Sequence, residues 1–88
     1  MSTAMGDTVH VRVCCKEWKA LRSTIRFPME SSSEEEESAF GCVVDFRCLT
    51  VSQWHFLQPE LMRADIPCDY IDYSLDEPHW TRKLQSCR

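Results

Sequence analysis

Apolar and polar residues alternate strictly in the first patterned stretch of the chain, TVHVRVCC at residues 8–15. Val9, Val11 and Val13 would share one side of an extended chain, and His10 would lie on the other. A period of two is typical of a strand with one buried face. The pattern therefore predicts a half-buried β-strand over residues 8–15.

The next segment, KEWKALRSTIRF at 16–27, fits two periods. Its large apolar residues share one stripe at the helical period, whereas its second half alternates as a strand does. No Ser, Thr, Asp or Asn stands where a helix would need its N-terminal cap, and Phe27 precedes a proline, which favours extended backbone. We therefore expect a strand at 20–27 and keep a helix over 16–26 as the alternative.

Three patterned segments lie in the second half of the chain. The stretch at 39–49 is apolar on one face and partly apolar on the other, which is typical of a central strand. Residues 51–64 place their large apolar side chains in one stripe, which predicts a helix lying on the sheet, although Pro59 interrupts it. Alternation returns at 67–74 and predicts a last strand.

These elements predict an α+β fold, a small and mostly antiparallel sheet with one helix packed on it; the alternative with two helices is βαβαβ. A chain of 88 residues has room for one small domain, expected at 8–80. A flexible N-terminus at 1–7 would precede it and a basic tail at 81–88 would follow. Residues 28–38, PMESSSEEEES, lack apolar periodicity and are expected to form a solvated acidic loop.

The formal net charge of −4 is unevenly distributed along the chain. Residues 1–30 carry five basic groups against three acidic ones, and residues 31–80 carry two against eleven. The last eight residues carry three basic groups and no acidic one. Such asymmetry favours electrostatic association with a partner. An acidic chain without a nucleic-acid-binding motif argues against nucleic acid as that partner.

No long apolar run or secretory signal pattern is present, so we expect a cytoplasmic or nuclear protein without a membrane partner. In a reducing compartment the six cysteines are expected to be free thiols. A zinc site built on Cys42, Cys48, Cys68 and a histidine is the alternative, although the close cysteine pairs of structural zinc sites are missing. Glycine-rich phosphate loops and the HExxH and GxSxG motifs are also missing, so we expect neither an enzyme nor a cofactor.

Three tryptophans are many for so small a core, and tryptophan is enriched where proteins bind one another. We expect Trp18 and Trp80 to contact a partner. The basic residues Arg12, Arg22 and Arg26 are expected to contribute to the same binding, or to attract the acidic loop.

Ser31, Ser32 and Ser33 each stand three positions before a glutamate, a pattern that resembles the sites of acidophilic protein kinases. A phosphate adds about −1.5 to −2 charges. The segment is therefore predicted to be a phosphorylatable regulator of binding, or otherwise a charged loop that prevents unwanted strand pairing.

The function predicted from these features is a non-enzymatic protein–protein interaction module. It would be a small subunit or adaptor of an intracellular hetero-oligomeric complex, since its core is small and its aromatic content high. The alternative is a small zinc- or thiol-dependent protein that uses its cysteines and histidines.

Overall fold

The computed structural model describes residues 8–25 and 33–87. The elements are, in chain order, β1 (Thr8–Cys14), α1 (Cys15–Arg22), β2 (Ser33–Ser38), β3 (Gly41–Thr50), α2 (Val51–Arg63) and β4 (Cys68–Asp72).

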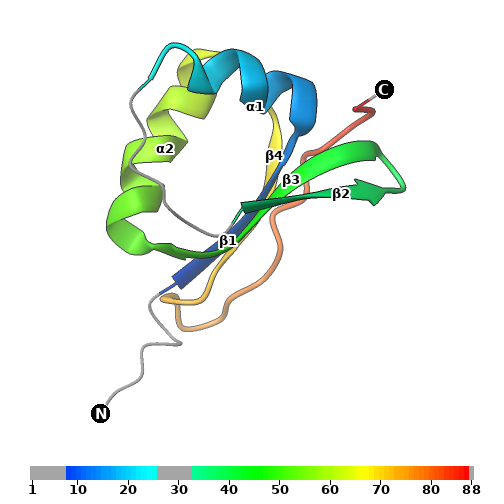
Figure 1. The fold of residues 1–88 in the computed structure, drawn as a ribbon. Helices are drawn as coiled ribbons and strands as arrows, with labels where there is room; N and C mark the ends of the chain where they lie inside the picture. Colours follow the sequence, from blue (N-terminus) through cyan, green and yellow to red (C-terminus); the bar gives the residue numbers. More distant parts are fainter. Residues whose placement is uncertain (1–7, 26–32, 88) are drawn as a thin grey trace.

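The four strands form one antiparallel sheet in the order β2-β3-β1-β4. Both helices lie on one side of this sheet, and the C-terminal segment crosses the other side (Figure 1). The element order βαββαβ and this strand order are those of the ferredoxin-like split βαβ motif. The predicted α+β class is confirmed, but the described residues form two helices where we expected one.

The alternation that predicted the first strand is visible in the burial of β1. Val9, Val11 and Val13 have no exposed surface, whereas His10 and Arg12 on the opposite face are partly exposed. Because β1 is central and pairs with both β3 and β4, its apolar face forms the middle of the core.

The expected strand at 20–27 is wrong for the part of it that the structure describes. The chain is helical in α1, which begins at Cys15, directly after β1, and has no side-chain cap. Trp18 and Leu21 are both buried on its inner face, and the Trp18 ring meets Phe46 edge-on with centroids 5.0 Å apart. Most helical stability in proteins comes from packing of the apolar face, so burial outweighs the missing cap.

The expected acidic loop at 28–38 is also wrong over its last six residues, which form β2, while residues 28–32 lie outside the described part. β2 is one strand of a hairpin with β3. Gly41 takes a φ of 115° after the turn, a conformation that suits glycine, and its carbonyl accepts a hydrogen bond from the Ser38 hydroxyl at 2.8 Å. Main-chain pairing with β3 therefore orders a sequence that has no apolar pattern of its own.

The remaining elements match their predictions closely. α2 begins after Thr50, which forms a capping box with Gln53, and it runs through Pro59 without ending. β3 is displaced by one or two residues from the expected strand at 39–49, and β4 is shorter than the expected 67–74.

The main core lies between the helices and the sheet, where Trp54 of α2 contacts Tyr70 of β4 with ring centroids 4.7 Å apart. A smaller buried cluster on the opposite face joins Cys14, Val43 and Leu84. None of the helices in the described residues has the length and apolarity needed to cross a membrane.

Candidate functional site

Two features of the sheet are candidates for function, its acidic edge and the face opposite the helices. β2 stands at one end of the strand order, and among the described residues no strand pairs with its outer side. Glu34, Glu35 and Glu37 are exposed, and Glu36 is half-buried. An edge strand offers unpaired main-chain groups to an incoming strand, and here the edge carries negative charge on both faces.

Only weak attachments hold the β2 carboxylates. Lys19 of α1 lies 3.9 Å from Glu35, and both side chains are well exposed. Arg47 of β3 donates a hydrogen bond to Glu36 across the hairpin. This bond and the charge of Asp45 raise the pKa of the Arg47 guanidinium above its usual value. Exposed ion pairs contribute little to stability, so these carboxylates remain available to a cationic partner.

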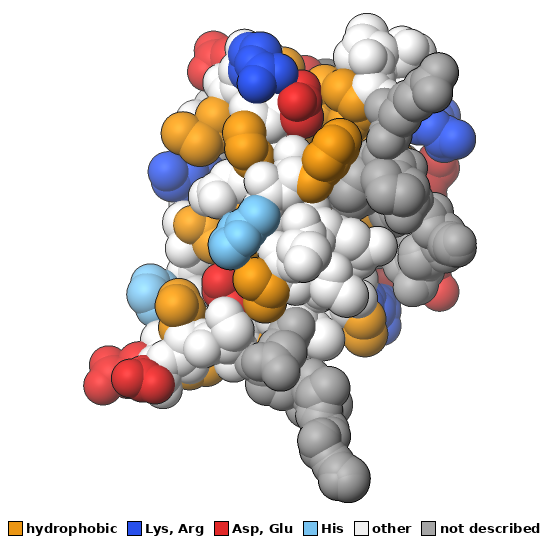
Figure 2. All heavy atoms as spheres, turned by 90° about the vertical axis from the view of Figure 1, so that its left-hand side faces the viewer, with side chains coloured by type: hydrophobic (Ala, Val, Ile, Leu, Met, Phe, Trp, Pro, Cys, Tyr) orange, Lys and Arg blue, Asp and Glu red, His pale blue; other side chains and the backbone are white. Residues whose placement is uncertain are grey.

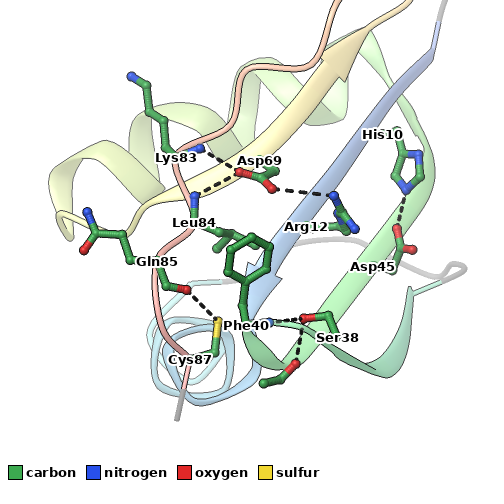
Figure 3. Close-up of polar contacts among 11 residues, drawn as sticks. His10, Arg12, Ser38, Phe40, Asp45, Asp69, Lys83, Leu84, Gln85 and Cys87 are labelled. Carbon is green, nitrogen blue, oxygen red and sulfur yellow. Dashed lines mark hydrogen bonds and ion pairs between the residues drawn. The ribbon is translucent and has the colours of Figure 1, made fainter.

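The sheet face opposite the helices holds two buried carboxylates. Asp45 of β3 is 3 % exposed and Asp69 of β4 is 1 % exposed. His10 contacts the Asp45 carboxylate, and Arg12 lies 3.5 Å from that of Asp69 (Figure 3). Buried charges persist only when they are paired, and β1 supplies both partners from neighbouring positions of its exposed face.

Residues 80–87, which we name the C-terminal strap, cover this face. Thr81 exchanges two main-chain hydrogen bonds with Tyr70 of β4, at 2.7 and 3.1 Å. Asp69 Oδ1 then accepts the main-chain N–H groups of Lys83 at 2.6 Å and Leu84 at 2.9 Å (Figure 3). The strap therefore continues the sheet briefly at the β4 edge and then crosses the face.

Both ends of the strap are anchored. The Trp80 ring lies 4.9 Å from the His10 ring and 4.9 Å from the Arg12 guanidinium. At the other end Cys87 forms a disulfide with Cys14 of β1. The Cys87 N–H donates to the Phe40 carbonyl at 2.7 Å. The basic tail expected at 81–88 thus packs on the domain as far as the structure describes it.

Four cysteines are disulfide-bonded in the structure, in contrast to the free thiols that we expected. Cys14 pairs with Cys87 on the strap side of the sheet, and Cys15 pairs with Cys42 on the helix side. Cys14 and Cys15 are neighbours in the sequence but point to opposite faces of the sheet. Their disulfides therefore attach the strap on one face and the start of β3 on the other. Spacing along the sequence could not reveal these pairs, because each depends on the sheet register.

The two cysteines that remain free differ in their surroundings. Cys48 is exposed on β3, whereas Cys68 is buried on β4. Burial, followed by the charge of Asp69, raises the pKa of the Cys68 thiol to about 11. This thiol is therefore protonated at neutral pH, which is the opposite of what a nucleophile or metal ligand needs.

The alternative zinc site on Cys42, Cys48 and Cys68 is not assembled in this structure, because Cys42 forms a disulfide with Cys15. Within the described residues, one group has metal-ligand donors within 4.8 Å of one another, and it consists of Cys15, Glu35 and Cys42. Two of its three donors are the bonded sulfurs, so the group offers a metal three ligands only when that disulfide is reduced.

A groove of about 640 Å³ lies between α2, β4 and the strap. Trp54, Tyr70 and Cys68 form part of its wall, and Lys83 reaches it from the strap. Figure 2 shows hydrophobic side chains scattered among polar ones on the face that lies to the left in Figure 1. The larger exposed ones on α2 are Phe56 and Met62. They are separate residues rather than a continuous apolar patch.

The expected partner-binding residues lie in different places. Trp18 is 7 % exposed and belongs to the core, so little of its surface could contact a partner. Trp80 of the strap contacts Arg12 on the sheet face opposite the helices, whereas Arg22 is exposed on α1 on the other side of the sheet. The structure does not bring these residues together as one basic face.

The predicted phosphorylation sites fall at the edge of what the structure describes. Ser33 is the first residue of β2. Ser31, Ser32 and the predicted contact Arg26 lie outside the described residues.

Sequence reasoning missed the carboxylates of Asp45 and Asp69 as organising residues. One signal was present, since each stands on an alternating strand that can lie beside the basic positions of β1. The register pairs Arg12 with both Asp45 and Asp69. That pairing follows only once β1 is known to be central, which its sequence alone does not establish.

The chain matches no protein-family model, and comparisons with curated proteins and with solved structures found no match. The candidate site therefore has to be interpreted from its own geometry.

Proposed function

We propose that this chain is a non-enzymatic interaction module that binds a basic, extended segment of a partner protein along the outer edge of β2. It would act as a small subunit or adaptor of a hetero-oligomeric complex. The observation that carries the proposal is a terminal strand with three exposed glutamates and no pairing strand on its outer side among the described residues.

Strand addition would use both properties of β2, an ordered main chain at the edge of the sheet and a row of negatively charged side chains. In this mode, main-chain hydrogen bonds supply affinity and alternate side chains supply specificity. Glu34 and Glu36 alternate with Glu35 and Glu37, so a partner strand with basic residues on both faces has complementary charge. The same carboxylates repel a second copy of β2, which protects the edge from pairing with itself.

Ser33, the first residue of β2, and the two serines that precede it in the sequence would adjust the strength of this binding. Phosphate on Ser31, Ser32 or Ser33 would add negative charge beside the glutamates and strengthen the attraction to a basic partner. We expect treatment with an acidophilic kinase to tighten binding and to steepen its dependence on salt, as measured by titration calorimetry. A variant with alanine at all three serines is the control and should not respond.

The first test is binding of a short lysine–valine peptide, with lysines on both faces of its extended form, to the full chain. Glu34→Lys together with Glu37→Lys should weaken binding by about tenfold, since each exposed charge pair contributes up to about 1 kcal/mol. Asp76→Lys with Glu77→Lys makes the same charge change in the exposed segment after β4 and should have a smaller effect. Equal losses from both variants would show that the peptide responds to net charge alone.

The cytoplasmic or nuclear location remains a prediction, and the disulfides bear on it. Disulfides persist in oxidising surroundings, whereas a reducing compartment would hold the same cysteines as thiols. The edge of β2 carries no cysteine, so the proposed binding applies to both states.

The second candidate function is a zinc- or thiol-dependent protein, and the Cys15, Glu35 and Cys42 group favours it. Elemental analysis of fully reduced protein tests it. One equivalent of zinc that is lost on Cys42→Ser would support this function, and metal-free reduced protein would contradict it.

A further inference from the structure

We propose that the sheet face opposite the helices is a docking groove for the C-terminal strap, and that when the Cys14–Cys87 disulfide is open the groove accepts the strap of a second copy of this chain. This inference is independent of the proposed function, because β2 is the far end of the sheet from β4, where the strap enters.

The face contacts the main chain of the strap as well as its side chains. The buried carboxylate of Asp69 accepts two successive N–H groups, those of Lys83 and Leu84. Tyr70 of β4 adds its own main-chain pair with Thr81. With the strap in place this carboxylate is 1 % exposed and receives two main-chain donors, so it binds an extended segment through its main chain.

Side-chain anchors then fix the position of the strap along the groove. Trp80 packs on His10 and Arg12 at one end, at 4.9 Å in each case. Leu84 is 8 % exposed and completes the small apolar cluster with Cys14 and Val43. An aromatic and an aliphatic residue four positions apart therefore occupy two distinct places on the face.

The charged side chains of the strap and of the face have separate partners. The strap contributes Arg82 and Lys83, both exposed, whereas the buried carboxylates of the face already have basic partners on β1. The Arg82 guanidinium lies 5.7 Å from the Trp80 ring, so the basic side chain stays with the aromatic anchor. Docking of a strap, including that of a second copy, therefore rests on the main-chain bonds and on the two side-chain anchors.

The connection between β4 and the strap allows the exchange. Residues 73–79 are all exposed. At its first residue the Tyr73 N–H donates to the Thr8 carbonyl of β1 at 3.0 Å, which extends the pairing of β4 with β1. The next bonds are local: Asp72 accepts from Ser74 at 2.9 Å through its side chain and from Leu75 at 3.3 Å through its carbonyl. A connector with so few contacts can redirect its strap to another molecule while every strap contact is kept, which is the low-cost route of segment swapping.

While the Cys14–Cys87 disulfide is closed, the strap stays on its own molecule, and when it is open the strap can dock on a second copy. A dithiol opens it by thiol–disulfide exchange, and the reductant leaves as its own disulfide while Cys14 and Cys87 become thiols. Glutathione disulfide restores it, taking the two thiol protons and two electrons and leaving as two glutathione thiols. When the disulfide forms again, Cys14 pairs with the Cys87 that then lies in the groove, whether it belongs to the same chain or to a second copy.

A complementation experiment tests the proposal with full-length chains that cannot close the bond within one molecule. The acceptor carries Cys87→Ser and keeps Cys14, the donor carries Cys14→Ser and keeps Cys87, and both carry Cys48→Ser to remove the exposed thiol. The two are mixed in a glutathione redox buffer. We expect a disulfide-linked heterodimer joined through Cys14 and Cys87, identified by non-reducing electrophoresis and peptide mass spectrometry.

Substitutions in the straps separate docking from chance oxidation. Leu84→Asp in the donor should lower the heterodimer yield at least about tenfold because its anchor no longer fits the apolar cluster, whereas Gln85→Asp, at an exposed strap position, should change it little. Leu84→Asp in the acceptor should raise the yield, since the competing strap is weakened. Absence of heterodimer, or a yield that does not change with Leu84→Asp in either chain, would overturn the proposal.

Discussion

The carboxylate of Asp69 has partners of two kinds, the guanidinium of Arg12 and the main-chain N–H groups of Lys83 and Leu84. At the scale of single residues, this side chain connects β1, β4 and the strap. The packing of the strap on the sheet therefore depends on a residue that, in the sequence, is only one polar position of an alternating strand.

Asp69→Ala should destabilise the protein by about 3 kcal/mol, because it leaves Arg12 partly buried without its counter-charge and removes two hydrogen bonds. Urea unfolding measures the loss, and amide hydrogen exchange should show faster exchange at Leu84. Asp76→Ala, in the exposed segment after β4, is the matched control. Unchanged exchange at Leu84 would contradict the role given to Asp69.

Cys68 makes stability depend on pH in the alkaline range. Its pKa is raised from 9.0 to about 11 in the folded state, so the folded state holds the thiol proton more tightly than the unfolded state does. The resulting stability is fully present below pH 9 and is lost as the pH rises towards 11, by up to about 2–3 kcal/mol.

Urea unfolding at pH 8 and pH 10.5 measures this loss, with Cys48→Ser in the background to remove the exposed thiol. Cys68→Ala in the same background removes the titrating thiol and should show a smaller loss between the two pH values. An identical loss in both proteins would assign the pH dependence to other groups.

At the scale of elements, the sequence predicted β1, α2 and, with shifted or shorter ends, β3 and β4, because these have apolar residues at a clear period. It failed for α1 and β2. α1 is stabilised as a helix by packing of its buried face on the core, including the contact of Trp18 with the Phe46 ring of β3, which no local pattern contains. β2 is ordered by main-chain pairing with β3, and its glutamates carry the composition of a loop.

Pro59 gives a test of α2 as a continuous helix. Its ring is exposed, and a proline in the middle of a helix removes one main-chain hydrogen bond and crowds the preceding turn. Pro59→Ala should therefore stabilise the protein by about 1–2 kcal/mol, allowing for the greater freedom of the unfolded chain. Thermal unfolding measures the gain, and Glu60→Ala, at the next position, should give none. A loss of stability in Pro59→Ala would contradict a continuous α2.

At the scale of the whole molecule, two disulfides hold a small domain from both faces of its sheet. The Cys14–Cys87 bond joins residues 73 positions apart, and the Cys15–Cys42 bond joins residues 27 positions apart. A small domain has little stability to spare, so these bonds are expected to contribute a large share of it.

Cys87→Ser should cost about 4 kcal/mol and Cys42→Ser about 3.5 kcal/mol, by the loop entropy that each bond removes from the unfolded chain. Urea unfolding without reductant measures both, and Cys48→Ser, which breaks no bond, should leave the free energy of unfolding unchanged. Losses no larger than that of the control would show that the disulfides do not stabilise the fold.

Of the candidate site, the sequence predicted only the charge. The acidic run and the three serines were visible in the sequence, but its position at the end of a sheet follows from the strand order. The strap was visible as a basic tail, and its docking on Asp69 follows from the register that places β4 beside β1.

A nuclear Overhauser map of the isotope-labelled chain with the lysine–valine peptide bound tests whether a partner strand joins the outer edge of β2. If a partner strand joins β2, cross-strand contacts should connect peptide amides to the outward amides of β2, and those amides should become protected from hydrogen exchange. Contacts confined to side chains, or located at β4 or the strap instead of β2, would contradict strand addition at the acidic edge.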